Sequence, residues 1–280
     1  MTVTAQTPAA KSGPVSELLD RYRNDPDLSS PDSATVSVAF ITSQAARHSG
    51  RSGGYRNQVV SLRVGAATGS CAVEPDSLDP RVVYACAGMH VAELLEHEEL
   101  AIRVAALDAY LTNRRPHASD ARAETVQLEP GTSLQRSMAR ARFVTGLVDA
   151  PLDGRVLVIG VVNSLLACLR ERGVQYVPCD FKGGFTEWGE SIVTDFTAWV
   201  DDCDAVLASG MMLGNGSLDR LLELTAKTRR PVPVTLFAQS GAAVARELLG
   251  RGVDSLSAEP YPFFWLTGDA SVLHLYRACP

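Results

Sequence analysis

The sequence predicts a two-domain α/β protein whose C-terminal half is a doubly wound, Rossmann-like parallel sheet. Three observations lead to this fold class. The C-terminal half alternates short apolar runs with helical segments. The run RVLVIG at 155–160 has the length and continuous apolarity of a buried parallel strand. The N-terminal half places strands first and helices after them, which is typical of a smaller α+β domain.

Apolar runs and helical segments follow one another regularly in the C-terminal half. The predicted parallel strands are 155–160, 175–179, 204–209 and 232–237, and the predicted helices are 134–148, 164–173, 218–228 and 242–252. Strand–helix–strand repeats at this spacing need crossover connections, so the sheet should be parallel and covered on both faces.

The N-terminal half starts with Thr, Ala, Ser and Pro residues that lack periodicity, so we predict a disordered tail over 1–15. The elements predicted after it are a short helix capped by Ser16, strands at 34–41 and 58–64, and a helical stretch over 90–111. A polar stretch over 112–133 is expected to join the domains. We therefore place the N-terminal domain at 16–125 and the Rossmann-like domain at 126–280.

The overall charge and hydropathy exclude several classes of protein. The formal net charge is −6, which gives no basic excess for a nucleic-acid footprint. No apolar run approaches the roughly 18 residues of a membrane span, and the first residues lack the apolar core of a secretory signal. We expect a cytoplasmic protein with a small-molecule ligand, and neither nucleic acid nor membrane as a partner.

Metal-ligand patterns are weak in this sequence. The 6 cysteines are scattered without a C-x-x-C pair, so we expect small buried hydrophobic residues in a reducing compartment, and no structural zinc. His90, Glu93 and His97 could share one helix face, but they lack the His-Glu-x-x-His spacing, and a solvated face is the preferred interpretation. A divalent metal cofactor stays open.

The loops after the predicted parallel strands form the candidate binding site, because ligands of such sheets bind outside the carboxyl ends of the strands. Gly160 and Asn163 follow the first strand, but the three-glycine fingerprint is absent, which argues against standard NAD binding. Asp180 ends the second strand where a ribose-binding carboxylate would lie, with an ordinary turn residue as the alternative. Lys182 stands among glycines and aromatic residues, a setting suited to an anion or a ring.

The loop after the third strand combines glycines with an asparagine ahead of a helix. Its candidate ligand-binding residues are Gly210, Asn215, Gly216, Ser217 and Asp219. Glycines let the backbone approach a ligand, and a helix N-terminus presents unpaired N–H groups that favour an anion. A plain capped turn would explain Ser217, but it explains the glycines less well.

Two further segments complete the candidate site. Gln239 and Ser240 follow the fourth strand and should lie at the same edge of the sheet. Arg47 and Arg51 belong to the polar, Gly-rich segment 47–57, which is either an anion clamp reaching from the first domain or a flexible hairpin tip.

On these segments, the chain resembles the heavy-metal chelation family, a domain of unknown function. The resemblance covers most of 17–270, and its most specific part is 204–222, where a strand runs into Gly-x-x-x-x-Asn-Gly-Ser-Leu-Asp-x-x-Leu. The helix 101–111 and the strand with its glycine at 155–160 support it, with Asp108 where the family's helix has Asn. The resemblance implies an enolase N-terminal-like domain joined to a Rossmann-like domain, a site between them and a homodimer. The family's name implies metal chelation.

Three functions are consistent with these observations. The first is a small-molecule enzyme of specialised or metallophore-type metabolism that binds an anionic, nucleotide-like or amino-acid-like ligand in the interdomain cleft. The second is a non-catalytic protein that binds a metal or a metal chelate. The third is an S-adenosylmethionine-binding, methyltransferase-like protein, for which Asp180 qualifies although the glycine-rich first loop is missing. The reaction and the catalytic residues stay open.

Overall fold

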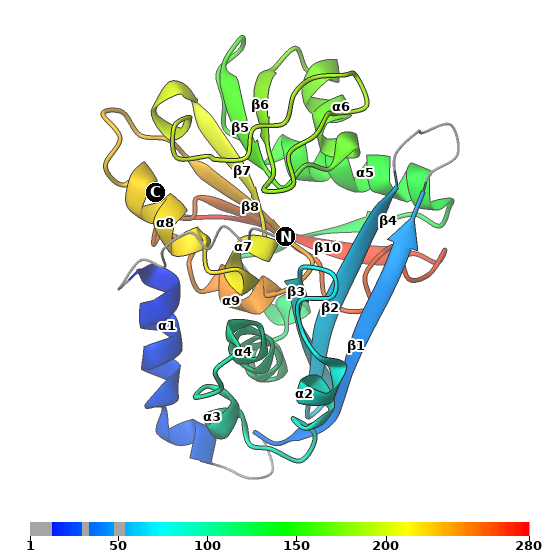
Figure 1. Cartoon of the computed structure of the whole chain (residues 1–280), viewed down its shortest axis with the longest axis vertical. Coiled ribbons are helices and arrows are strands. Elements are labelled where there is room, and N and C mark those ends of the chain that lie inside the picture. Colours follow the sequence, from blue (N-terminus) through cyan, green and yellow to red (C-terminus); the bar gives the residue numbers. More distant parts are fainter. Residues whose placement is uncertain (1–12, 30–33, 48–53, 280) are drawn as a thin grey trace, which may run out of the picture.

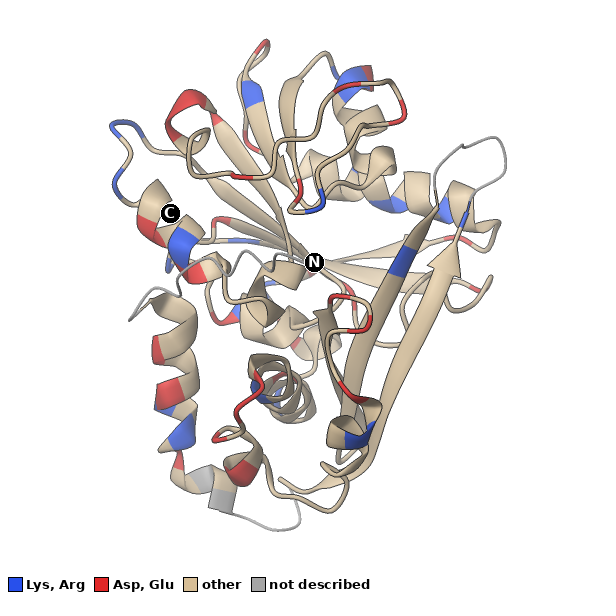
Figure 2. Cartoon of the chain, viewed as in Figure 1, with Lys and Arg blue, Asp and Glu red and all other residues tan. Residues whose placement is uncertain are grey.

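The computed structural model describes residues 13–29, 34–47 and 54–279, in which two β-sheets are joined (Figure 1). A 7-stranded sheet has the order β4-β10-β9-β8-β7-β5-β6, and a 3-stranded sheet has the order β1-β2-β3. The predicted fold class, a mostly parallel sheet with a smaller α+β part, is confirmed. Lys and Arg are interspersed with Asp and Glu over both parts (Figure 2).

The large sheet contains the predicted parallel strands and three more. Its strands are β4 (Glu124–Leu128), β5 (Arg155–Ile159), β6 (Gln175–Cys179), β7 (Ala205–Ser209), β8 (Val234–Ala238), β9 (Ser255–Ala258) and β10 (Ser271–Arg277). Strands β5 to β9 run parallel, and β10 pairs antiparallel with both β9 and β4. The sequence analysis missed β4, β9 and β10, and β4 lies in the stretch that was expected to be a linker.

Helices cover both faces of this sheet. They are α5 (Ser133–Gly146), α6 (Asn163–Glu171), α7 (Met211–Gly214), α8 (Leu218–Thr225) and α9 (Ala242–Arg246). Side chains alternate between faces along a strand, so Val156 and Val158 belong to the buried cluster that includes α5 and α6, while Leu157 and Ile159 belong to the cluster that includes α8 and α9. Burial on both faces explains why the β5 sequence is apolar at successive positions.

The smaller part is an antiparallel meander followed by helices. Its elements are α1 (Pro14–Arg23), β1 (Val36–Ala46), β2 (Tyr55–Val64), β3 (Ala67–Val73), α2 (Pro80–Tyr84), α3 (Val91–Leu94) and α4 (Leu100–Arg114). The predicted helical stretch 90–111 is thus divided between α3 and α4. Helix α4 lies on β3 so closely that a Cβ atom built on Gly69 would be 1.9 Å from the amide nitrogen of Ala109.

One continuous core joins the two parts, since buried side chains of β2, α4, α9 and the large sheet belong to a single cluster. Backbone contacts reinforce this seam. The Gly241 N–H donates to the Ser70 carbonyl at 2.6 Å, and a Cβ atom built on Gly214 would be 2.6 Å from the Ala72 carbonyl oxygen. Backbone atoms of the two parts are therefore in direct contact along this seam.

The start of α1 differs from the prediction. The helix begins at Pro14 with Gly13 as its N-cap, so Ser16 is not the cap but a residue of the first turn. The predicted disordered tail 1–15 overlaps this turn, and residues 1–12 of the tail lie outside the described residues.

Among the described residues, no helix is both long enough and apolar enough to cross a membrane.

Candidate functional site

The large sheet has a topological switch point between β5 and β7. From β5 the chain moves outward to β6, and then crosses back to β7 on the other side, followed by β8 and β9. Gly160, directly after β5, has a φ of +87°, and a Cβ atom there would be 2.6 Å from Cβ of Ser209 at the end of β7. Glycine is required at 160 by this close approach and by its left-handed backbone. Parallel sheets of this kind bind ligands at such a point.

Asn163 is the first residue of α6 beside this switch point, and Val162 is the N-cap. The Oδ1 atom of Asn163 is buried and has no hydrogen-bond partner in the described part of the chain. A buried amide oxygen normally accepts a bond from protein, water or ligand. Asn163 thus has a buried acceptor that is free to bond a ligand or a water beside the switch point.

The turn after β6 uses Asp180 and Lys182 differently. The Asp180 carboxylate accepts hydrogen bonds from the backbone N–H groups of Lys182 at 3.0 Å and Val161 at 3.4 Å. This is the ordinary turn role named as the alternative interpretation. The Lys182 ammonium pairs with Glu74, just after β3, with 2.8 Å between Nζ and Oε2. Lys182 therefore connects the switch-point edge to the smaller part.

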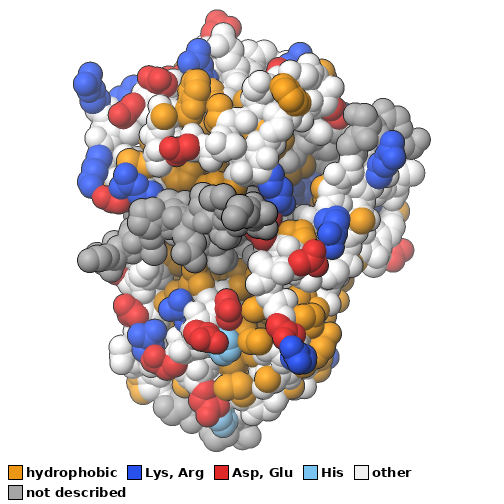
Figure 3. Space-filling view, in the orientation of Figure 1, with side chains coloured by type: hydrophobic (Ala, Val, Ile, Leu, Met, Phe, Trp, Pro, Cys, Tyr) orange, Lys and Arg blue, Asp and Glu red, His pale blue; other side chains and the backbone are white. Residues whose placement is uncertain are grey.

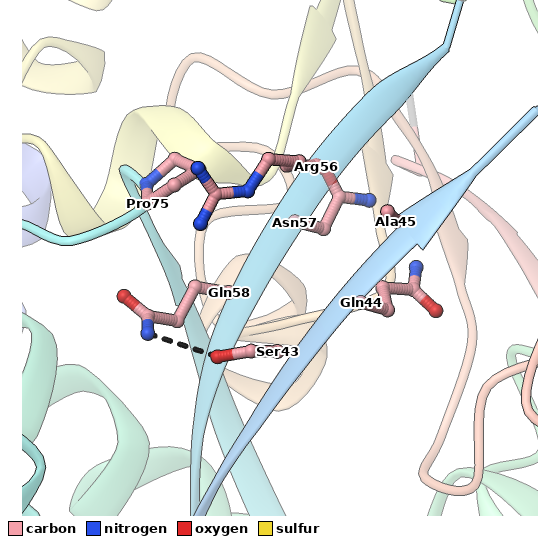
Figure 4. Close-up of a pocket in the computed structure, with 7 residues that line it drawn as sticks. All are labelled: Ser43, Gln44, Ala45, Arg56, Asn57, Gln58 and Pro75. Carbon is pink, nitrogen blue, oxygen red and sulfur yellow. Dashed lines mark hydrogen bonds between the residues drawn. The ribbon is translucent and has the colours of Figure 1, made fainter.

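An open cavity of about 220 Å³ lies next to this ion pair. It is lined by Ser43, Gln44, Ala45, Arg56, Asn57, Gln58 and Pro75. Figure 4 shows the Arg56 side chain extending toward Pro75, which directly follows Glu74, and Gln58 bonded to Ser43. The Arg56 guanidinium pairs with Asp76 at 3.3 Å. The cavity wall belongs to β1, β2 and the turn after β3, and the turn residue Pro75 directly follows Glu74, the partner of Lys182.

Arg47 and Arg51 were the arginines predicted from the sequence to bind an anion in the segment 47–57. Arg47 is exposed directly after β1, and Arg51 lies outside the described residues. Arg56, in the same Arg-rich segment 47–57, is the arginine that lines the cavity. Arg56 belongs to β2, whose pairing with β1 forms this wall of the cavity.

A buried polar cluster lies at the carboxyl ends of β8 and β9. Glu259 accepts hydrogen bonds from Arg140 at 2.9 Å, from the amide of Gln239 at 3.0 Å and from the backbone N–H of Phe264 at 2.6 Å. The Arg140 guanidinium lies 5.7 Å from the ring centre of Phe237. The sequence prediction placed Gln239 at this edge but did not identify Arg140 or Glu259.

A small cavity of about 10 Å³, lined mainly by polar residues, lies beside this cluster, between the two parts. It is lined by Thr68, Ser70, Asp108, Thr112, His117, Gln239, Ala242, Glu259, Pro260 and Tyr261. Asp108 accepts hydrogen bonds from the backbone N–H groups of Ser70 at 2.8 Å and Ala243 at 2.7 Å, so one carboxylate bridges β3, α4 and α9.

Asp108 should make the stability of the fold depend on pH. Burial raises the pKa of its carboxyl from 3.8 to about 6, against the opposing hydrogen bonds from Ser70 and Ala243 and the charge of Arg246. The folded state therefore binds the proton more tightly than the unfolded chain. Its contribution to the free energy of unfolding should fall as pH rises from about 4 to about 6, by up to about 3 kcal/mol.

Urea unfolding of the parent and of Asp108→Asn across this pH range measures the effect. Asp120 and Asp204, whose carboxyl pKa values are lowered by Arg122 and by the Arg155 backbone respectively, act in the opposite direction but cancel in the difference between the two proteins. A difference that stays constant with pH would contradict the prediction.

The loop 210–219 contributes to the seam rather than to the open cavity. A Cβ atom on Gly210 would be 2.9 Å from the Ser240 carbonyl, and Ser240 itself is buried. Asn215 Oδ1 accepts bonds from the Ser217 N–H at 3.0 Å and the Ser217 hydroxyl at 2.6 Å. Close packing at Gly210 and the hydrogen bonds between Asn215 and Ser217 therefore explain why the loop contains these residues.

Asp219 and Gly216 have structural roles in this loop. Both carboxylate oxygens of Asp219 accept hydrogen bonds from the start of α1, at 2.7 Å from Val15 N–H and 3.1 Å from Ser16 N–H. Asp219 therefore caps α1 from another element of the protein, and its contact with a ligand stays a prediction. Gly216 has a φ of +75°, and a Cβ atom there would lie 3.4 Å from Leu100, so a larger residue would strain the backbone.

The histidine pattern also has a local explanation. His90 is the N-cap of α3 and donates its backbone N–H to Glu93 at 2.8 Å, whereas His97 lies beyond the end of α3 and accepts from the Glu99 N–H at 3.0 Å. The three residues thus do not share one helix. In the part of the chain that the structure describes, no three His, Cys, Asp or Glu side chains are grouped to hold a metal.

The protein is an α/β protein in which a mostly parallel sheet with a switch point is joined to an antiparallel meander. The Lys182–Glu74 ion pair links the edge of the sheet that carries the switch point to this meander. No family model and no curated protein matches the chain. Its fold is similar to that of two solved DUF364 proteins of unknown function. The one from Desulfitobacterium hafniense is 18% identical with a TM-score of 0.57, covering 88% of this chain and 86% of that chain. The one from Pyrococcus horikoshii is 13% identical with a TM-score of 0.56, covering 94% of this chain and 99% of that chain. These similarities concern the fold alone.

Proposed function

We propose that the protein is a small-molecule enzyme that binds an anionic, amino-acid-sized ligand in the open cavity beside the switch point. One observation carries the proposal: a cavity lined by Arg56 and other polar residues of β1 and β2 ends at Pro75, which directly follows Glu74, the ion-pair partner of Lys182 from the large part. Sites of small ligands are commonly formed between domains and at such switch points.

The charges around the cavity favour an anionic group. Arg56 and Lys182 are 64% and 61% exposed, so their ion pairs with Asp76 and Glu74 contribute little stability and exchange readily. A carboxylate or phosphate can replace Asp76 or Glu74 as their partner. Each of these basic side chains lies beside an acidic one, Arg56 beside Asp76 and Lys182 beside Glu74. A ligand that carries both a positive and a negative charge, such as an amino acid, therefore complements this region better than a polyanion does.

The cavity size supports the amino-acid-like ligand over the nucleotide-like one. Its volume of about 220 Å³ is below the range of roughly 300–1,000 Å³ that is common for drug-sized ligands. A metal chelate, which brings its own metal ligands and a negative charge, is the second candidate and fits the family resemblance. S-adenosylmethionine is the third candidate.

Binding measurements with Lys182→Gln and Arg56→Gln test the proposal. Calorimetry against amino acids, nucleotides, S-adenosylmethionine and citrate chelates of divalent metals should find an anionic ligand. Each substitution should weaken its binding about twofold to fivefold, the effect of losing one exposed charge contact.

Arg81→Gln is the matched control. Arg81 is 88% exposed, and its partner Asp79 is its neighbour in the chain, outside the cavity lining. The Arg81→Gln substitution should leave the affinity for the ligand unchanged. Equal affinities in the parent, Lys182→Gln and Arg56→Gln would place the ligand elsewhere, and tighter binding of a metal chelate than of any amino acid would favour the second candidate.

A further inference from the structure

We propose that the small cavity beside Asp108 is a binding site for one ammonium group, either the free ion or the end of a primary amine. This inference does not rest on the proposed function, because the small cavity and the open cavity share no lining residue. It follows from the hydrogen-bonding groups, the charge and the size of the cavity.

The walls are rich in oxygen atoms that can accept hydrogen bonds. β3 contributes Thr68 and Ser70, α4 contributes Asp108 and Thr112, and the segment after β9 contributes Glu259. An ammonium group offers only donors, arranged tetrahedrally, so it complements such a wall.

His117 provides an atom that still lacks a partner. The residue is 3% exposed, and its Nδ1 lies 2.7 Å from the hydroxyl of Tyr276, which does not line the cavity. Its Nε2 is buried and without a hydrogen-bond partner in the described residues. Burial and the charge of Arg246 lower the pKa of His117 to about 3, so the imidazole is neutral at pH 7. The proposal takes the tautomer with the proton on Nδ1, in which the ring donates to the Tyr276 hydroxyl and Nε2 is an acceptor; in the other tautomer Tyr276 donates to Nδ1 and Nε2 is a donor.

The charge balance favours a cation over water. Glu259 is compensated by Arg140 at 2.9 Å. Asp108 receives backbone N–H groups but, within the described residues, forms no ion pair with a lysine or arginine, and the nearby Arg246 is 3.7 Å from Asp120. Arg246 therefore acts on Asp108 only from a distance, and a buried carboxylate without a direct ion-pair partner is costly, which a monocation in the cavity would offset.

The size of the cavity limits the occupant. About 10 Å³ corresponds to one water-sized molecule. An ammonium ion or the –NH₃⁺ end of an amine meets this limit, whereas a trimethylated amine exceeds it.

Thermal unfolding of the full chain in different chloride salts tests the inference. At equal ionic strength, ammonium chloride should raise Tm in a saturable manner, potassium should act more weakly because it lacks directed N–H donors, and tetramethylammonium should match sodium. A saturable shift with methylammonium would identify the amine end of a ligand as the source, and a shift with ammonium alone would identify the free ion. Equal shifts with ammonium and sodium would overturn the site and leave an ordered water only.

Two variants locate the effect. Asp108→Asn removes the charge, and His117→Phe removes the Nε2 acceptor while keeping an aromatic ring. Each should weaken the ammonium response about tenfold or more, as expected for a lost hydrogen bond to a charged group. His97→Phe, outside the cavity lining, is the control. If Asp108→Asn does not fold, His117→Phe decides alone, and an unchanged response in it would overturn the inference. Binding of the anionic ligand is measured separately, so either proposal can fail without the other.

Discussion

Replacing Asp219 with alanine is expected to lower the free energy of unfolding by about 4 kcal/mol. The Asp219 side chain is buried and receives three hydrogen bonds from α1, from Val15 N–H, Ser16 N–H and the Ser16 hydroxyl at 2.7 Å. The first N–H groups of a helix have no partner inside the helix, so the substitution would leave two of them without an acceptor. The negative charge at the helix N-terminus would also be lost.

Glu223→Ala on the same helix is the control for Asp219→Ala. Glu223 forms exposed ion pairs with Arg220 and Lys227, so its loss should cost less than about 1 kcal/mol. Urea unfolding measures both variants, and hydrogen exchange should show that α1 loses protection in Asp219→Ala. Equal stability of the two variants would contradict the capping role.

Gly69→Ala is expected to destabilise the protein by about 4 kcal/mol or to prevent folding. The added Cβ atom would collide with backbone atoms of α4, at 1.9 Å from Ala109 N and 2.6 Å from the Ala105 carbonyl oxygen. Because both neighbours are backbone atoms of a buried helix, relief requires the helix to move away from β3. Overpacking of this kind costs about 1–3 kcal/mol when side chains can adjust, and more when they cannot.

Gly146→Ala is the matched control for Gly69→Ala. Gly146 ends α5, and a Cβ atom there would meet nothing within 4 Å. Alanine should be neutral or stabilise the fold by about 0.5–1 kcal/mol, since it reduces the freedom of the unfolded chain. Similar melting temperatures for the two variants would show that α4 and β3 are not packed as described.

The parallel strands could be predicted from sequence where burial on both faces produced a continuous apolar run, as at 155–160. β9 gives no such signal, since its sequence is Ser-Leu-Ser-Ala although all four residues are buried. Its central position between β8 and β10 comes from pairing across the sheet. Long-range pairing of this kind has no local signature.

The residues at the carboxyl ends of the parallel strands could be predicted from the sequence. The roles of the residues that lie in the seam between the two parts could not. The rule for parallel sheets led to Gly160, Asn163 and Lys182, which lie at or beside the switch point. The glycine loop 210–219 has the composition of a ligand loop, but the partners that explain it, such as Ala72 and Val15, come from distant parts of the sequence. Local reasoning cannot tell a glycine that admits a ligand from one that admits another segment of the same protein.

The hydrogen bond between Val15 and Asp219 spans 204 positions of sequence, and this has a consequence for the order of assembly during translation. The α1 segment is synthesised early, yet its capping carboxylate is added only about 200 residues later, which takes roughly 10–40 s at the usual pace of synthesis. Strand β4 similarly can pair with its neighbour only after β10 has been synthesised, since Leu128 pairs with Ser271. Both segments must therefore remain unpaired on the nascent chain, and α1 should be among the elements that dock late.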